Sequence, residues 1–347
     1  MRRAYLDWNA TAPLRPEARA AVIEALDVLG NPSSVHAEGR AAKRIVARAR
    51  EQVAAAAGAG GSDVVFTASA TEAAALGAAG RGLASAPVEH DCVAAWTDGS
   101  LAVSPGGEVD VPDPARSAVQ AANSETGIVQ DLPSSLALTD AVQAFGKVPF
   151  DFKRSGARMA LLSSHKIGGP RGAGALLLRR GQDVRAVLRG GGQEMGRRAG
   201  TEDVAAIAGF GAAAEAAARD LADGRWEGVA ELRNVLESLL EDGDHQTISI
   251  GKEAVRLPNT LCVIAPGWRG ETQVMRMDLA GFAISAGSAC SSGKVRASRV
   301  LTAMGHAAVD AGCAIRVSIG PGTTMDEVRR FSDAWRTARD KAARRAA

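Results

Sequence analysis

The sequence predicts an α/β protein with two domains: a large domain with a mainly parallel sheet flanked by helices, and a smaller α+β domain towards the C-terminus. Apolar runs of strand length alternate with helical patterns from Val64 to about Ala144, which is typical of β–α–β units. After Thr201 this alternation gives way to long helices and separated short strands. The 347 residues, 46% of them hydrophobic, can bury a core in each domain.

Two helices are expected before the first strand. Pro16 fits a first helical position, where its missing N–H costs nothing, and a second helix runs through Arg40 to a stop at Gly58. A strand over residues 64–67 follows, and the stretch after Ser69 opens an alanine-rich helix. Further strands are predicted over the apolar runs 118–122, 136–139, 159–163 and 173–178.

The C-terminal part should combine helices with a second set of strands. Helices are predicted over 202–222, 229–240, 271–279 and after Thr324, and strands over 247–250 and 260–264. We therefore expect a large domain of residues 13–222 and a smaller domain that combines residues 1–12 with 223–347.

Charge and composition exclude several classes of function. Lys and Arg number 41 against 39 Asp and Glu, for a net charge of +2, so no strong field favours nucleic acid or an acidic membrane. The N-terminus carries Asp7 where a signal peptide needs an apolar segment, and no apolar run approaches the length of a membrane span. We expect a cytoplasmic protein.

Neither the cysteines nor the histidines form a metal-binding pattern. The four cysteines contain no C-x-x-C pair, which argues against a zinc cage and a disulfide framework. The five histidines show no ligand spacing, so no metal is expected. Cys262 and Cys313 fit buried hydrophobes, whereas Cys290 lies in a run of small residues without a packing pattern and should be reachable.

Lys166 lies where a strand should deliver an amine into a turn-lined pocket. It follows the apolar run 159–162 and precedes the glycine-rich stretch 168–174. Such a lysine is either a reactive amine or an ordinary cation at a strand end. Asp140 ends another apolar run with Gln143 one turn later, and a carboxylate at a strand end suits the ring nitrogen of pyridoxal phosphate. Lys166 and Asp140 together suggest that cofactor.

Two segments could bind a phosphate. A helix that begins at Thr71 directly after a strand leaves free N–H groups, which Ala70 and Thr71 would direct at the anion; the alternative is a routine N-cap with Glu72 in the first turn. Thr201 follows a loop rich in glycine and arginine and could supply a hydroxyl, or the loop could be a mere connection.

His90 and Arg316 are further candidates with plain alternatives. His90 lies in the stretch 88–91, near an expected strand end, and could be a surface turn histidine. Arg316 ends a short apolar run before the glycine turn 320–322. Its planar fork could clamp a carboxylate or form an internal ion pair.

Short motifs occur in a fixed order along almost the whole chain. They are LDWNATAP at 6–13, GNPSSVH at 30–36, SATE at 69–72, EH at 89–90, ETGIVQ at 125–130, SSHK at 163–166, RAGT at 198–201 and GSAC at 287–290. In this order they closely resemble the cysteine desulfurases of the class V aminotransferase group. The resemblance implies a fold type I pyridoxal-phosphate-dependent transferase that works as a homodimer.

The resemblance also implies roles at the cofactor. Lys166 would hold it covalently and shuttle the Cα proton, Asp140 would pair with the ring nitrogen, Gln143 would donate to the ring hydroxyl, and His90 would stack on the ring as an acid/base. Thr201 would reach the phosphate in the neighbouring subunit. The implied cofactor contacts are Ala70, Thr71, His90, Asp140, Gln143, Ser163, His165, Lys166 and Thr201.

At the substrate, the resemblance implies that Arg316 holds the carboxylate of L-cysteine, with Ser124 and Asn31 as further contacts. Cys290, carried by the smaller domain, would attack the substrate sulfur and become a persulfide, so that alanine is released. The catalytic residues would thus be Lys166, His90 and Cys290. A sulfur-acceptor or scaffold protein would take the sulfur for iron–sulfur cluster or thio-cofactor assembly.

The chain departs from the family pattern at three places. Ser124 and Ala75 stand where the family has asparagines, and the segment between Gly82 and Glu89 is short. A serine reaches less far than an asparagine, so weaker turnover or another substrate is an alternative, as in a selenocysteine or cystine lyase. A further alternative is a degenerate homologue that binds the cofactor but acts as a partner or regulator in a sulfur-transfer assembly. The retained site residues argue against this alternative.

Overall fold

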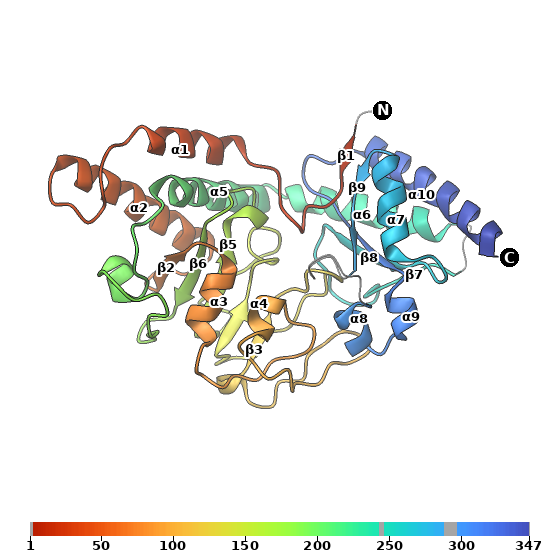
Figure 1. Ribbon diagram of the computed structural model, residues 1–347, viewed down its shortest axis with the longest axis horizontal. Helices are drawn as coiled ribbons and strands as arrows, with labels where there is room; N and C mark the ends of the chain where they lie inside the picture. Colours follow the sequence, from red (N-terminus) through yellow and green to blue (C-terminus); the bar gives the residue numbers. More distant parts are fainter. Residues whose placement is uncertain (1–2, 243–245, 288–296, 347) are drawn as a thin grey trace.

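The computed structural model describes residues 3–242, 246–287 and 297–346. In Figure 1 the helices and strands of residues 16–222 lie on one side, and those from residue 225 onwards lie on the other. In the described ranges, no helix combines the length and the apolar character that a membrane crossing needs.

The main sheet has five strands. Their order across the sheet is β2 (Asp63–Thr67), β6 (Gly174–Leu178), β5 (Met159–Ser163), β4 (Leu138–Asp140) and β3 (Ala118–Gln120). β6 pairs antiparallel with both of its neighbours, while β5, β4 and β3 pair parallel. Because β6 alone is reversed, the other four strands run in one direction, which confirms the predicted mainly parallel sheet.

Alternate residues of the strands pack on opposite faces of this sheet. Phe66 and Leu177 belong to the hydrophobic cluster on one face, while Val65 and Leu176 belong to the cluster on the other. This alternation follows from the period of two in a strand, and burial of both faces explains why the strands read as continuous apolar runs.

Helices cover both faces. On one face, α5 (Val204–Ala222) packs against α1 (Pro16–Leu26) and α2 (Ala37–Ala56). On the other, α3 (Ala70–Ala78) lies on β5 and β6, with the short α4 (Asp91–Ala94) beside it. The predicted α/β class is therefore confirmed.

The C-terminal part holds a second, antiparallel sheet. Its order is β10 (Ser285–Ala286), β11 (Ala314–Ser318), β8 (Thr260–Ile264) and β7 (Ile248–Ser249). The helices of this part are α6 (Arg225–Glu241), α7 (Gly270–Leu279), α8 (Arg299–Ala303), α9 (Ala308–Ala311) and α10 (Met325–Ala346). Trp335 and Phe331 of α10 are fully buried against this sheet. The chain also contains short 3-10 turns at Pro114–Arg116, Ser164–Lys166 and Gln193–Gly196.

The N-terminal segment joins the C-terminal part, as Figure 1 shows. β1 (Ala4–Tyr5) pairs in parallel with β9 (Phe282–Ala283), and Asp7 forms a bridge to Ser318 of β11. No strand was predicted before residue 64, because a strand of two residues, such as Ala4–Tyr5, is too short to show an alternating pattern. The domain limits 13–222 and 223–347 stay a prediction.

Candidate active site

A cavity of about 420 Å³ opens at the carboxyl ends of the parallel strands. This is where open α/β sheets bind ligands. Gln120, Asp140 and Ser163, the last residues of β3, β4 and β5, line it together with the start of α3 and parts of the N-terminal and C-terminal segments. The predicted site residues in its lining are Ala70, Thr71, His90, Ser124, Asp140, Gln143, Ser163, His165, Lys166 and Arg316.

Three predicted residues are not in this lining. Thr201 and Asn31 are exposed and lie outside the cavity. Cys290 lies outside the described residues. Their assigned roles stay predictions.

Lys166 is presented by the 3-10 turn that directly follows β5. Its Nζ donates to the backbone carbonyl oxygens of Asn9 at 2.7 Å and Ala10 at 2.9 Å. The N-terminal segment thus holds the amine at the edge of the cavity, where a bound carbonyl compound could reach it.

Asp140 carries a buried carboxylate in the cavity lining. It is 8% exposed, and its Oδ1 accepts from the backbone N–H of Val142 at 2.9 Å. Burial raises its pKa, which His90 and Lys166 partly offset. Among the described residues it forms no salt bridge, so a protonated ring nitrogen in the cavity would supply the missing partner.

His90 is fixed by the residues that follow it. It caps the start of α4, and its Nδ1 accepts from the backbone N–H of Cys92 at 3.2 Å. The Sγ of Cys92 lies 3.0 Å from the same nitrogen. Because Nδ1 accepts, the proton of the neutral ring sits on Nε2. Cys92 was not among the predicted site residues; burial raises the pKa of its thiol.

The start of α3 has the features that would bind an anion. The Ser69 hydroxyl accepts from the N–H of Glu72 at 3.2 Å, which leaves the first N–H groups of the helix for a ligand. Glu72 itself would repel a phosphate, but Arg198 pairs with its carboxylate at 2.7 Å. His165 lies nearby, and burial, with help from Lys166 and Arg171, lowers its pKa to about 4, so it is neutral at pH 7 and able to donate one N–H.

Arg316 lies at the other end of the cavity. Its Nη2 donates to Oδ1 of Asp7 at 2.8 Å, and its Nη1 donates to the carbonyl oxygen of Ser124 at 3.0 Å. A second residue that the sequence analysis left without a role, Asn9, contacts Lys166 and Gln143 through its carbonyl oxygen. Asp7 and Asn9 both belong to the motif at 6–13, so this motif could have indicated that they are site residues.

The donor set fits pyridoxal phosphate. An anion site, a carboxylate for a ring nitrogen, a histidine and an amine for the aldehyde line one cavity. Among the described residues, no group of His, Cys, Asp and Glu could hold a metal ion.

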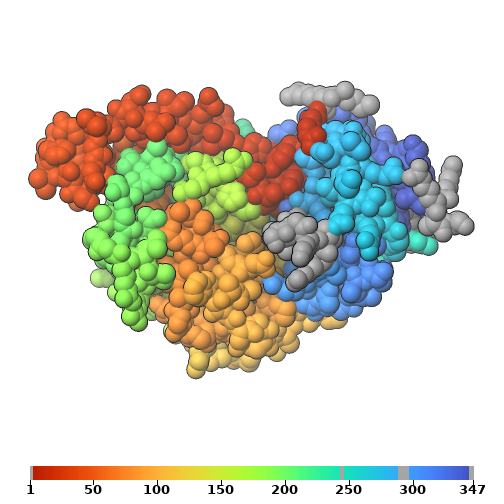
Figure 2. Space-filling view, viewed as in Figure 1, coloured from red at the N-terminus to blue at the C-terminus, as the bar shows by residue number. Residues whose placement is uncertain are grey.

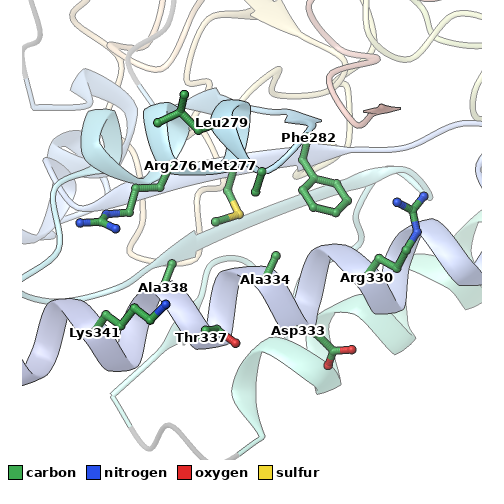
Figure 3. A pocket seen from close by; sticks show the side chains of 11 residues that line it. Arg276, Met277, Leu279, Phe282, Arg330, Asp333, Ala334, Thr337, Ala338 and Lys341 are labelled. Atoms are coloured by element: carbon green, nitrogen blue, oxygen red, sulfur yellow. The ribbon is translucent and has the colours of Figure 1, made fainter. Parts of the chain in front are cut away.

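A larger hollow of about 570 Å³ lies in the C-terminal part, between α7 and α10. Figure 3 shows Met277 and Phe282 facing Ala334 and Ala338, with charged side chains towards the ends. None of its lining residues faces Lys166 or Asp140, so it is separate from the cavity described above.

Comparison with known proteins decides the family. The family model for class-V aminotransferases matches residues 4–103 and 91–331. The chain belongs to this family. The cysteine desulfurase of Frankia sp. (strain EuIK1) is 39% identical, with 95% of this chain and 89% of the relative covered. The cysteine desulfurase of Cereibacter sphaeroides is 38% identical, covering 95% and 94%.

Solved structures of the family share the fold. The NifS-like protein from Rickettsia africae ESF-5 superimposes with a TM-score of 0.87 at 28% identity, covering 97% of this chain and 99% of that one. This similarity over nearly the whole length confirms the expected fold type I architecture of class-V enzymes.

Proposed function

We propose that this protein is a pyridoxal-phosphate-dependent cysteine desulfurase, which converts L-cysteine to L-alanine and keeps the sulfur as an enzyme persulfide. The observation that carries the proposal is the common cavity of the Lys166 amine, the buried Asp140 carboxylate and the Arg316 guanidinium. The curated relatives with the same family match are named cysteine desulfurases. When bound, the cofactor supplies an electron sink next to the substrate Cα.

The residues of the cavity divide the work. Lys166 would hold the cofactor covalently and move the proton at the substrate Cα. Asp140 would pair with the ring nitrogen and keep it protonated, and His90 would serve as the acid/base at the ring. The N–H groups of Ala70 and Thr71 bind the phosphate with Ser163 and His165. Arg316 would bind the substrate carboxylate, and Ser124, whose carbonyl oxygen accepts from Arg316, lines the cavity beside it.

Cys290 takes the sulfur in this proposal. Its thiolate attacks the substrate sulfur, so that an S–S bond forms on the enzyme as the C–S bond breaks. The electron pair of the broken bond stays on the substrate carbon, which is protonated, and alanine leaves. A sulfur-acceptor protein then takes the terminal sulfur for iron–sulfur cluster or thio-cofactor assembly.

A homodimer with shared sites fits the exposed surface. The end of α1, the start of α2 and the segment between them form an arm that projects beyond the rest of the molecule in Figure 2. Leu26, Leu29 and Val35 on this arm are 70%, 82% and 87% exposed, which is unusual for side chains of this size unless a partner covers them. We assign Thr201 and Asn31, which do not line their own cavity, to the neighbouring subunit's site.

The test is alanine release from L-cysteine under reductant. The loaded wild type should release alanine, Cys290→Ser should lose persulfide formation and turnover, and Lys166→Ala should lose both the visible absorbance of the covalently bound cofactor and activity. Equal alanine from wild type and Cys290→Ser would indicate a lyase that needs no thiol. Turnover of selenocysteine but not cysteine would indicate a selenocysteine lyase, and no release of alanine would favour a regulatory homologue.

A further inference from the structure

Lys147 is a buried amine that the proposed reaction does not use. It lies one turn after Gln143, is 2% exposed, and does not line the cavity. Among the described residues it forms no salt bridge, and the charged groups that act on it are the cations Lys166 and Arg316. Burial and these two cations lower its pKa well below the usual value of a lysine.

Two side-chain oxygens satisfy this amine. Nζ of Lys147 donates to Oδ1 of Asn9 at 2.9 Å and to Oε1 of Gln143. An unsatisfied amine at this depth would destabilise the fold, because a buried polar group without a partner has lost its hydrogen bonds to water. The position of Lys147 is therefore tied to the orientation of the Gln143 amide.

The contact decides which end of that amide faces the cavity. Oε1 of Gln143 points towards Lys147, because Nζ of Lys147 donates to it. Nε2 then lies on the other side, where it donates to the carbonyl oxygen of Asn9 at 3.0 Å. An NH₂ group has a second hydrogen, and Gln143 lines the cavity, so this hydrogen is available to a ligand.

Asn9 connects this pair to the reactive amine. Its carbonyl oxygen accepts from both Gln143 and Lys166, and its Oδ1 accepts from Nδ2 of Asn259 at 3.0 Å as well as from Lys147. The amide of Gln143 and the amine of Lys166 are thus held against the same residue. Through hydrogen bonds, a change at Lys147 reaches the cavity by way of Gln143 or Asn9.

We propose that Lys147 is a positioning residue that fixes the Gln143 amide with its N–H towards the ring oxygen of the cofactor, and that polarises this N–H. The proposal rests on the proposed cofactor. Without the Lys147 amine, the amide could rotate and present its oxygen, an acceptor, where a donor is needed.

The experiment titrates the visible absorbance of the protein loaded with pyridoxal phosphate, for wild type and Lys147→Met. A donor to the ring oxygen favours the form with more negative charge on that oxygen, so it lowers the pH midpoint of the chromophore. Loss of one such hydrogen bond should raise the midpoint by about one pH unit. Lys153→Met, at an exposed lysine, is the matched control and should keep the wild-type midpoint.

A double-mutant cycle separates this role from a general structural one. If Lys147 acts through Gln143, then Lys147→Met should cause no further shift in a Gln143→Leu background. A full additional shift in that background would overturn the proposal, as would a wild-type midpoint in Lys147→Met.

Lys147→Gln keeps an N–H donor and should shift the midpoint less than Lys147→Met does; a shift as large as in Lys147→Met would overturn the proposal. If Lys147→Met does not fold, Lys147→Ala takes its place in both measurements. A wild type without any visible band would instead contradict the proposed function itself.

Discussion

Arg316 and Asp7 form a nearly buried ion pair in the lining of the cavity. Nη2 of Arg316 lies 2.8 Å from Oδ1 of Asp7, and the Ser285 hydroxyl donates to Oδ2 of Asp7 at 2.8 Å. Asp7 of the N-terminal segment therefore joins Ser285 of β10 to Arg316 of β11. The carbonyl oxygen of Ser124 also accepts from Nη1, so the guanidinium plane is fixed before a carboxylate binds. This lowers the entropy that the side chain of Arg316 loses on binding.

Replacing the fork with a single ammonium should weaken substrate binding. We expect Arg316→Lys to raise the KM for L-cysteine by about 10-fold or more, because a bidentate charged contact is lost. The change in kcat should be smaller, since the carboxylate does not react. Steady-state alanine release measures both constants, with Arg185→Lys at an exposed position as the control. An unchanged KM would place the carboxylate elsewhere.

Asp140→Asn should have opposite effects on activity and on stability. Without the carboxylate the ring nitrogen is not kept protonated, and we expect kcat to fall by about 100-fold or more, the scale of a lost electrostatic contribution in a buried site. Without cofactor, however, the variant should unfold at a higher temperature at pH 7, because it removes a buried carboxylate that has no cation partner among the described residues. Thermal unfolding of the cofactor-free proteins measures the second effect; a lower unfolding temperature would contradict it.

Glu125 should make stability depend on pH. It is 6% exposed, and burial raises its pKa from 4.5 to about 7, although Ser298 and Arg316 partly offset this. Between pH 4.5 and 7 the folded protein holds a proton that the unfolded chain has released, so the free energy of unfolding falls as the pH rises and levels off above 7. The full loss is about 3 kcal/mol.

Glu125→Gln tests this dependence. Denaturant unfolding at several pH values should show that the variant gains stability over the wild type from pH 5 to pH 8 (about the range of the shift). The same substitution at the exposed Glu24 is the control. A difference between Glu125→Gln and wild type that stays constant over this range would show that Glu125 does not titrate there.

Gly174 should be needed for the position of the anion site. A Cβ at this residue of β6 would lie 2.5 Å from the backbone carbon of Ser69 and 2.8 Å from the backbone nitrogen of Ala70. We expect Gly174→Ala to cost about 1–3 kcal/mol, as overpacking does, and to weaken pyridoxal phosphate binding because the start of α3 must move. Thermal unfolding and absorbance titration with the cofactor measure the two effects.

Gly228→Ala is the matched control for this prediction. A Cβ at Gly228, in α6, would meet nothing within 4 Å. This variant should gain about 0.5–1 kcal/mol from helix propensity and bind the cofactor as the wild type does. Equal behaviour of the two alanine variants would show that the close approach of β6 to α3 does not matter.

The sequence by itself determined the sheet and the residues presented at its edge. β5 was placed at its observed limits, since a continuous apolar run bounded by polar and glycine residues is a local pattern. Lys166 after β5 and Thr71 at the start of α3 follow from the same local order. Asp140 proved to be the last residue of β4, which begins at Leu138 rather than at 136, because strand ends depend on pairing with neighbours as well as on composition.

The tertiary structure decided everything that joins distant segments. The pairing of β1 with β9 places Asp7 on Arg316 and Asn9 on Lys166, although these partners lie 309 and 157 residues apart. It also decided that Lys147, which reads as an ordinary lysine in the chain, is buried with its Nζ on Oδ1 of Asn9, 138 residues away. A pattern of neighbours cannot report such contacts, because a hydrogen bond between remote residues exists only once the core between them has packed and fixed their distance and direction.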